Sequence, residues 1–233
     1  MRSVERLLWQ VTLFLISNRL CNIYHHHQDS LGTHATYISI PWKDAYPVPA
    51  SISTRTAAAS LLQGLTAYTF FEEAYPVKAG DTILVHTIAG GMGLLFAQLS
   101  RARGVTVIGT TSNKEKAELG KQNGATHVIL YREEDTVQRV LELTNGEGVD
   151  AVFDGVGKDT YVSDVCSSSF AYDRFRDDRF DNNFKLIRRK GTIVSYGNAS
   201  GPVPPFAPIK LVEKNLKLLR PTSVSAVRDM GWL

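Results

Sequence analysis

The chain has few of the sequence features that mark disulfide-rich, metal-binding or membrane-spanning proteins. Its 233 residues include two cysteines, Cys21 and Cys166, whose positions match neither a metal site nor a disulfide framework. No apolar run reaches the ~18 residues that a membrane-spanning helix needs. The longest run, residues 7–17, is interrupted by Gln10 and Thr12, and no small-residue cleavage pattern of a secretory leader follows it. These absences predict a cytoplasmic protein without a membrane anchor.

Strong charge and several catalytic signatures are also missing. The formal net charge is only +3, and the densest basic group, residues 188–190, lies at an expected helix end, so charge does not argue for a nucleic-acid partner. No nucleophile elbow and no P-loop lysine motif occurs, which removes support for α/β hydrolases and P-loop enzymes. The triplet His25–His27 is interpreted as an incidental polar tract, because adjacent side chains of an extended segment diverge. We expect no metal site.

Residues 80–220 alternate between short apolar runs and helical patterns. Runs rich in Val, Ile and Leu predict strands at 81–87, 105–111, 126–131, 149–157, 191–198 and 216–221. Helical patterns occupy 91–104, 113–125, 134–148 and 207–215. Continuous apolar strands separated by single helices are typical of parallel strands joined by right-handed crossovers. The pattern therefore predicts an α/β fold with a doubly wound parallel sheet of the Rossmann type.

The stretch HTIAGGMG, residues 86–93, joins the first of these strands to the first helix. A dinucleotide pyrophosphate binds at such a helix N-terminus, where glycines let it approach the backbone. The G-x-G-x-x-G fingerprint is incomplete, since Ile88 stands where its first glycine would be. A tight turn with close helix–strand packing is the alternative, but the β/α elements that follow favour a cofactor loop.

The end of the second strand indicates which dinucleotide fits. NAD sites carry an acidic residue there, about 20 residues after the glycine loop, to bind the ribose 2′-hydroxyl. Residues 109–114 contain no acid; Thr110, Thr111 and Ser112 offer hydroxyls, and Lys114 and Lys116 follow. This composition favours NADPH over NADH, because a lysine attracts a 2′-phosphate and a carboxylate repels it. The alternative is that both lysines belong to the solvated face of a short helix.

Several separated motifs also occur in one order. LLQGLTAYTFFEEAYPVKAGDTILVHTIAGGMG, IGTTSNKEKAELGKQNGATHVILY and KGTIVSYGNASGPVPPFAPIKL resemble the zeta-crystallin-like quinone oxidoreductases, a zinc-free branch of the medium-chain dehydrogenase/reductase superfamily. The resemblance covers residues 32–161 and 184–222. It implies hydride transfer from NADPH to a quinone or another activated enone, often by a homodimer, in a cleft between a Rossmann domain and a GroES-like barrel.

The resemblance also implies particular cofactor-binding residues. Gly90, Gly91, Met92 and Gly93 would hold the pyrophosphate, Ser112 and Lys116 the 2′-phosphate, and Tyr131 the adenosine end; Gly155, Val156, Tyr196, Gly197, Asn198 and Thr66 would lie beside the rest of the cofactor and its nicotinamide. Without the family, Tyr131 is equally well a strand-end aromatic residue and Thr66 a helix-interior threonine. No residue is nominated as catalytic, because the family's polar groups beside the nicotinamide belong to a segment that has no counterpart here.

The chain departs from the family at both ends and in one internal segment. Only residues 32–62 resemble the GroES-like domain, so the resemblance implies a chain truncated at this barrel, and residues 1–31 stay unassigned with the texture of a disordered segment. Residues 63–222 form the expected NADPH-binding domain, with a polar insertion at 162–183, and residues 223–233 form a tail. An NADPH-dependent quinone or enone reductase is therefore expected. A catalytically impaired NADPH-binding fragment is the alternative, and RNA binding, known for some members of the family, is a weaker third.

Overall fold

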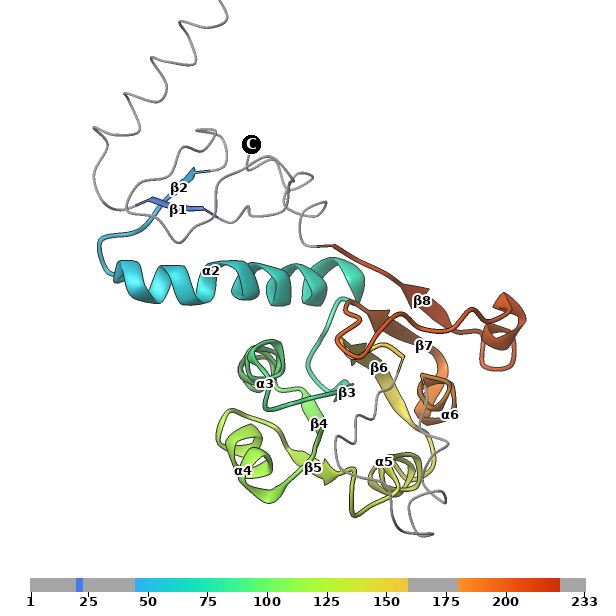
Figure 1. Ribbon diagram of the computed structural model, residues 1–233. Helices are drawn as coiled ribbons and strands as arrows, with labels where there is room; N and C mark the ends of the chain where they lie inside the picture. Colours follow the sequence, from blue (N-terminus) through green and yellow to red (C-terminus); the bar gives the residue numbers. More distant parts are fainter. Residues whose placement is uncertain (1–19, 23–44, 159–179, 223–233) are drawn as a thin grey trace, which may run out of the picture. The chain divides into compact units, whose positions relative to one another are not determined.

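The computed structural model describes residues 20–22, 45–158 and 180–222 of the chain (Figure 1). Contacts divide the chain into two compact units, residues 1–65 with 231–233 and residues 66–230.

The first unit contains a short antiparallel pair of strands. β1 (Leu20–Asn22) pairs with β2 (Ala45–Pro47), so a strand lies in the segment that the sequence leaves unassigned. Helix α2 (Thr54–Thr69) then begins behind Ser53, whose hydroxyl accepts a hydrogen bond from the Thr56 N–H at 3.0 Å. The described part of this unit shows no barrel, and the GroES-like remnant stays a prediction.

The second unit is built on a six-stranded sheet with the order β5-β4-β3-β6-β7-β8, in which every neighbouring pair is parallel. The strands are β3 (Thr82–Val85), β4 (Thr106–Thr111), β5 (His127–Leu130), β6 (Val149–Asp154), β7 (Ile187–Ser195) and β8 (Lys217–Leu219). The helices are η2 (Phe70–Ala74), α3 (Gly91–Arg103), α4 (Lys114–Gln122), α5 (Thr136–Leu143), α6 (Asn182–Leu186) and η4 (Pro208–Leu211). Chain order reverses direction at β3, as in a dinucleotide-binding fold. The predicted doubly wound parallel sheet is confirmed.

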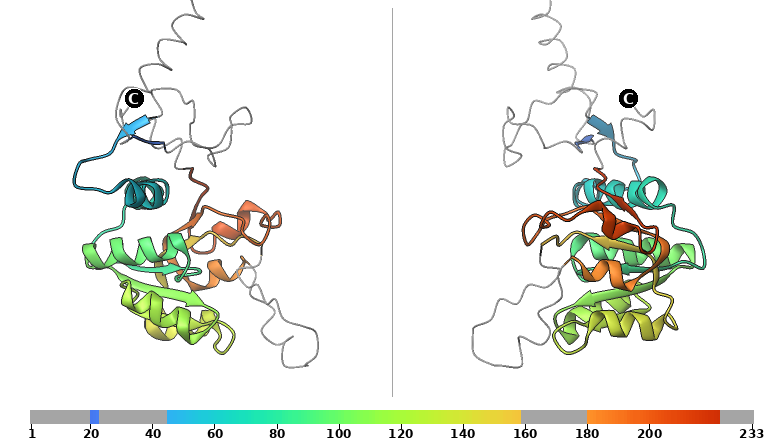
Figure 2. Two further views of the ribbon diagram at one scale, coloured as in Figure 1. Left: turned by 60° about the vertical axis from the view of Figure 1, so that its left-hand side comes forward. Right: turned by 90° about the vertical axis from the view of Figure 1, so that its right-hand side faces the viewer.

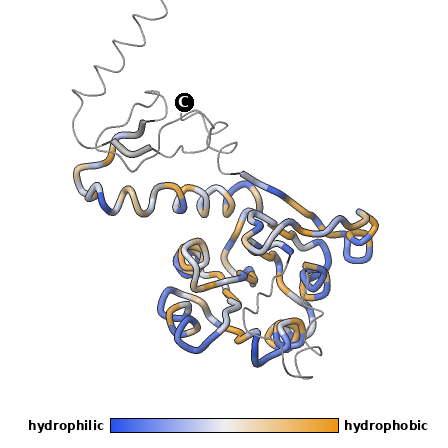
Figure 3. The backbone as a smooth tube through the Cα atoms, viewed as in Figure 1, coloured by the Kyte–Doolittle hydropathy of each residue, from blue (hydrophilic) through white to orange (hydrophobic). Residues whose placement is uncertain are grey.

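Alternate residues of the central strands feed two separate cores, one on each face of the sheet. Ile83 and Val85 of β3 pack with Phe71 and Phe96, which come from η2 and α3. Leu84, between them, packs on the opposite face in a second cluster that includes residues of α5 and α6. Figures 1 and 2 show these helices on the two sides of the sheet, and Figure 3 shows the hydrophobic residues concentrated in its strands. Burial on both faces explains why the strands read as continuous apolar runs.

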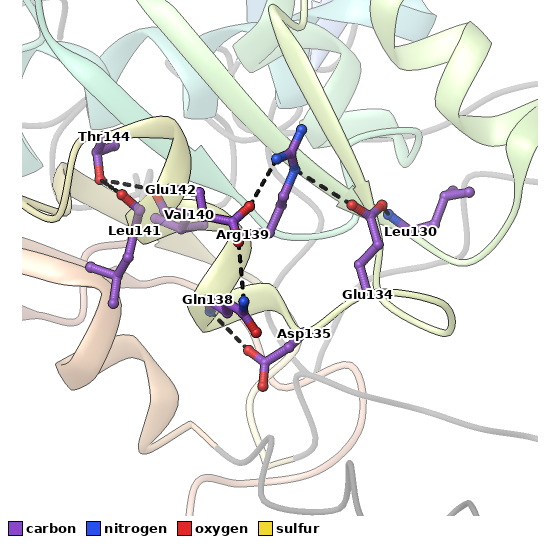
Figure 4. Close-up of polar contacts among 9 residues, drawn as sticks. All are labelled: Leu130, Glu134, Asp135, Gln138, Arg139, Val140, Leu141, Glu142 and Thr144. Atoms are coloured by element: carbon purple, nitrogen blue, oxygen red, sulfur yellow. Dashed lines mark hydrogen bonds and ion pairs between the residues drawn. The ribbon is translucent and has the colours of Figure 1, made fainter.

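Helix α5 shows how side chains set the limits of an element (Figure 4). The Asp135 carboxylate accepts a hydrogen bond from the Gln138 N–H at 2.9 Å and so caps the first turn. At the other end, the Thr144 hydroxyl donates to the Val140 carbonyl at 2.8 Å. Asn145 and Gly146 then have positive φ values of 53° and 85°, which are incompatible with a right-handed α-helix. The helix is therefore shorter than the predicted 134–148.

Two further segments differ from the sequence-based expectation. The predicted helix 207–215 is only the short 3₁₀ turn η4, which begins at Pro208, and Asn215 at the end of the segment has a φ of 52°. Strand β7 begins earlier than residue 191: Ile187 already pairs with Val149 before an irregularity that includes Lys190 at φ 64°. Within the described ranges, no helix has the length and apolar character required to cross a bilayer.

Candidate functional site

The candidate site lies between β3 and β6, where the order of strands in the sheet changes direction. β3 and β6 are neighbours, with Val85 opposite Phe153, and they continue into the loops 86–93 and 155–158. β7, the next strand, ends at Ser195 and continues into residues 196–201. In doubly wound sheets, ligands bind outside the carboxyl ends of the strands at this switch point.

The glycine loop presents unpaired backbone donors at this place. Helix α3 starts after Gly90, which has no side chain to cap it, and the first turn contains no acidic residue. Among the residues that the structure describes, no group accepts a hydrogen bond from the N–H groups of Gly91, Met92 or Gly93. Three free donors at the positive end of a helix dipole are an arrangement that can bind an anion.

The glycines of the loop have different roles. A Cβ on Gly93 would lie 2.5 Å from the Thr87 carbonyl oxygen and 2.6 Å from that of Ile88, so this glycine lets α3 pack against the loop. A Cβ on Gly90 would lie 3.2 Å from the Thr87 oxygen. A Cβ on Gly91 would meet nothing within 4 Å, and Gly90 and Gly91 are both exposed. The space beside Gly91 is therefore open to a ligand, which is the arrangement that a pyrophosphate loop needs.

Ile88, which replaces the first glycine of the fingerprint, is fully buried. Its side chain fills the space over two other glycines: a Cβ on Gly109 of β4 would lie 2.5 Å from the Ile88 Cβ, and one on Gly120 of α4 would lie 3.0 Å from its Cγ2. The tight turn is made instead by Thr87, whose φ is 54°, an uncommon value for a β-branched residue. The loop is thus anchored by a side chain, and the space beside Gly91 stays clear.

The residues proposed for the 2′-phosphate lie after β4. Ser112 is half-buried, and the Asn113 side chain accepts a hydrogen bond from the Lys116 N–H at 2.9 Å, which caps α4. The side chain of Lys116 is exposed. Tyr131 follows β5 and donates its N–H to the Thr111 carbonyl at 3.1 Å, so Tyr131 and Ser112 lie at one end of two paired strands. Ser112, Asn113 and Lys116 therefore follow β4 at that end, and residues 109–114 contain no carboxylate.

The loops after β6 and β7 pack closely against each other. A Cβ on Gly155 would lie 2.6 Å from the Tyr196 ring, and one on Gly197 would overlap the Gly155 carbonyl oxygen. Ala199 donates its N–H to the Gly155 carbonyl at 3.2 Å, and Ser200 donates to the Val156 carbonyl at 2.9 Å. Four of the proposed cofactor residues, Gly155, Val156, Tyr196 and Gly197, are thus brought together, with the exposed Asn198 beside them.

Tyr196 joins this pair of loops to the core. Its ring lies 5.6 Å from the rings of both Phe70 and Phe96. Burial, and then the nearby charge of Asp154, raise the pKa of its hydroxyl well above the usual range, so the group stays protonated. Thr66 is half-buried on α2 and precedes Ala67, which belongs to the same core cluster as Tyr196.

The sequence-based selection missed a buried polar group beneath the switch point. His86, Thr110, Asp154 and Asn183 are all less than 5% exposed and are joined by hydrogen bonds. His86 and Asp154 come at the carboxyl ends of two neighbouring strands, which was a usable signal. Asn183 gave none, because it lies in the segment interpreted as a polar insertion.

No cluster of three or more His, Cys, Asp or Glu side chains that could hold a metal ion occurs in the ranges 20–22, 45–158 and 180–222. Apart from Met92 and Val156, the residues proposed for the site are glycines, one amide, hydroxyls and one lysine. This donor set suits a phosphorylated dinucleotide.

Comparisons with known proteins point in the same direction. The family model described as "Zinc-binding dehydrogenase" matches residues 91–169. A probable quinone oxidoreductase of Schizosaccharomyces pombe is 42% identical over 192 residues, which are 82% of this chain and 52% of that protein. The chain thus spans about half the length of the curated relatives it matches.

Two solved structures have the same fold. The quinone oxidoreductase of Pseudomonas syringae matches with a TM-score of 0.69 and 36% identity, over 80% of this chain and 52% of that one. The Escherichia coli quinone oxidoreductase, solved as a complex with NADPH, matches with a TM-score of 0.65 and 33% identity, over 81% of this chain and 56% of that one.

Proposed function

Because this chain is a homologue of the quinone oxidoreductases of the medium-chain dehydrogenase/reductase superfamily, over about half of their length, we propose that it binds NADPH and transfers a hydride from it to a quinone or another activated enone. The observation that carries the proposal is the open start of α3. Its free N–H groups and the uncrowded Gly91 lie at the topological switch point of the sheet.

In this proposal, each part of the site takes one part of the coenzyme. Gly90, Gly91, Met92 and Gly93 bind the pyrophosphate through their backbone. Ser112 and Lys116 bind the 2′-phosphate, and Tyr131 covers the adenosine end. Gly155, Val156, Tyr196, Gly197, Asn198 and Thr66 line the rest of the cofactor up to the nicotinamide.

The coenzyme supplies the hydride, and the protein supplies orientation and exclusion of water. Gly155 and Gly197 suit this role because, without side chains, they let two loops and a tyrosine ring approach within van der Waals distance. Tyr196, kept protonated by burial, adds no charge beside the ring. Quinones and enones are electron-poor, so they accept a hydride without a metal to polarise them. No residue is assigned as a general acid.

A titration tests the first half of the proposal. We expect NADPH to quench protein fluorescence, with a Kd well below that of NADH. The matched control is Gly91→Asp, which adds a carboxylate to the open space of the loop and should abolish binding of both coenzymes while the fold is retained. Equal affinity of the wild-type chain and Gly91→Asp for NADPH would remove the glycine loop as its site.

Oxidation of NADPH in the presence of a quinone tests the second half. A reductase consumes NADPH only when the quinone is added, at a rate that saturates with both substrates. The second candidate function is NADPH binding without reduction. Tight NADPH binding without quinone-dependent oxidation would select it. RNA retention that NADPH displaces would select the third option, a nucleotide-binding role.

A further inference from the structure

A buried chain of hydrogen bonds runs beneath the switch point, from the start of the glycine loop to the loop after β6. The Thr87 N–H donates to the Thr110 hydroxyl oxygen at 3.4 Å, and this hydroxyl lies 3.2 Å from His86 Nδ1. His86 Nε2 lies 2.9 Å from Asn183 Oδ1, and Asn183 Nδ2 donates to Asp154 Oδ2 at 2.9 Å.

The chain ends in the backbone of the second loop. The other oxygen of Asp154 accepts hydrogen bonds from the Val156 N–H at 2.8 Å and the Gly157 N–H at 3.2 Å. Asp154 is fully buried. Among the described residues, its carboxylate is stabilised by three N–H donors: these two backbone groups and the amide of Asn183. Two of the loops proposed to hold the coenzyme are therefore joined through side chains.

The Asp154 carboxylate determines which groups donate and which accept along this series of hydrogen bonds. A carboxylate only accepts hydrogen bonds, so the amide of Asn183 must turn its Nδ2 toward Asp154 and its Oδ1 toward His86. Facing an acceptor, Nε2 of His86 must carry a proton. Nδ1 of His86 lies within hydrogen-bond distance of the Thr110 hydroxyl, which can donate or accept, so every group has a partner.

Asparagine suits the central position for a chemical reason. Its amide presents one acceptor and one donor about 2 Å apart, toward an N–H on one side and a carboxylate on the other. Aspartate would place a second carboxylate against Asp154, and leucine would leave both His86 and Asp154 without this partner. Because the site is buried, no water replaces a missing hydrogen bond, and either substitution should destabilise the network.

We propose that Asn183 is a positioning residue for the coenzyme: through His86 it holds the glycine loop after β3, and through Asp154 it holds the loop after β6, so that both lie at the correct separation to bind one dinucleotide. This rests on the proposed function, because it takes the two loops to bind the same ligand. Asn183 itself comes from α6, outside every motif that the sequence analysis assigned to the coenzyme.

The first test compares Asn183→Leu with a control at the opposite end of the sheet. Tyr75→Phe removes another partly buried hydrogen bond, of 3.1 Å to Asp81, far from the two loops. We expect the Kd for NADPH to rise about tenfold in Asn183→Leu and to stay within about twofold of the wild type in Tyr75→Phe. At saturating NADPH, the KM for a quinone should change little in either variant.

A double-mutant cycle separates positioning from general destabilisation. His86→Ala breaks the same chain one step away, so Asn183→Leu combined with His86→Ala should raise the Kd no more than the larger single effect. His86→Gln retains an N–H near the position of Nε2 and should restore most of the affinity lost in His86→Ala. Two effects that multiply, without rescue by glutamine, would contradict a shared chain.

The last measurement needs no variant to bind coenzyme. Nitrogen NMR of the wild-type imidazole should show His86 protonated on Nε2, with the signal assigned by its loss in His86→Gln. A ring protonated only on Nδ1 would overturn the positioning role. An unchanged Kd in folded Asn183→Leu, beside a wild-type chain that binds NADPH, would overturn it as well. A wild-type chain that does not bind NADPH would instead overturn the proposed function, and the coenzyme role of Asn183 with it.

Discussion

The amino and carboxyl ends of the parallel sheet differ in how their polar groups are paired. At the amino end, Asp81 accepts hydrogen bonds from the Tyr75 hydroxyl and the Lys78 N–H, at 3.1 and 3.0 Å. Asp150 accepts from the Thr82 N–H at 2.8 Å and forms an ion pair with Arg188. Both of these carboxylates are paired within the protein.

At the carboxyl end the pairing is selective. Asp154 is buried and accepts three hydrogen bonds. The N–H groups of Gly91, Met92 and Gly93 at the start of α3 have no acceptor among the described residues. The negative charge is covered and the positive helix end is open, so this end favours an anion. The comparison teaches that burial alone does not mark a site; the unpaired donors beside the buried network do.

The largest effect on this comparison should come from Gly93→Ala. The new Cβ would lie within 2.6 Å of two backbone oxygens, which cannot move aside as a side chain can. We expect the free energy of unfolding to fall by about 2–3 kcal/mol, and NADPH binding to be lost, because α3 is pushed away from the loop. Chemical denaturation and a fluorescence titration measure the two.

Gly91→Ala is its partner experiment, since the Cβ there meets nothing within 4 Å. Stability should be unchanged or slightly higher, because alanine favours a helix over glycine, while the affinity for NADPH falls. A Gly91→Ala variant that binds as tightly as the wild type would mean that the open space beside α3 is not the coenzyme site.

Asp150→Asn should give the opposite combination at the amino end. It keeps an acceptor for the Thr82 N–H but removes the charge that pairs with Arg188. Since Asp150 is buried, we expect a loss of about 1–2 kcal/mol in the free energy of unfolding. The Kd for NADPH, measured well below the unfolding transition, should not change. A weaker Kd would show that the two ends of the sheet are coupled, and the comparison would fail.

Lys116→Ala sharpens the description of the carboxyl end by separating two coenzymes. The exposed ammonium group would contact only the 2′-phosphate, so the Kd for NADPH should rise about fivefold to tenfold, or about 1 kcal/mol, and that for NADH should not change. Lys114→Ala is the matched control, since it removes an equally exposed lysine two residues away. Equal effects on NADPH and NADH would assign Lys116 to the solvated face of α4 instead.

Much of this fold could be predicted because its strands are buried on both faces. Runs such as Thr82–Val85 and Val149–Asp154 lack the alternation of a half-exposed strand, and single helices separate them, so a parallel sheet was the consistent solution. Helix ends were less predictable. Asn145 and Asn215 end their segments through positive φ values, which the periodicity of apolar residues does not encode.

The site was predictable only where it consists of consecutive residues. The glycine loop and the Ser112–Lys116 segment each carry their own motif. The network of His86, Asp154 and Asn183 joins residues up to 97 positions apart, and a single buried asparagine has no pattern that distinguishes it from a surface one. Ile88 was a visible departure, but its compensation by Gly109 and Gly120 depends on packing between three elements.

The smallest expected effects concern two tyrosines, one at each end of the sheet. Burial raises the pKa of both hydroxyls above their usual range; the charge of Asp81 adds to it at Tyr75, and that of Asp154 at Tyr196. The Tyr75 hydroxyl donates to Asp81, whereas that of Tyr196 has no hydrogen-bond partner among the described residues. At neutral pH, Tyr75→Phe should therefore lower the free energy of unfolding by about 1 kcal/mol and Tyr196→Phe by less than about 0.5 kcal/mol.

Raising the pH should make the free energy of unfolding depend on the Tyr196 hydroxyl. The folded state holds the proton above the ordinary tyrosine pKa of about 10, and the unfolded state releases it, so wild-type stability falls as the pH rises past that value. Tyr196→Phe cannot lose this contribution, and near pH 11 it should regain about 1 kcal/mol relative to the wild type. Denaturation curves at neutral and alkaline pH measure the difference, and tyrosinate absorbance of the folded chain checks the proton. A stability difference between wild type and Tyr196→Phe that is independent of pH would show that water reaches this hydroxyl, and that the carboxyl end is more open around Tyr196 than its packing against Phe70 and Phe96 indicates.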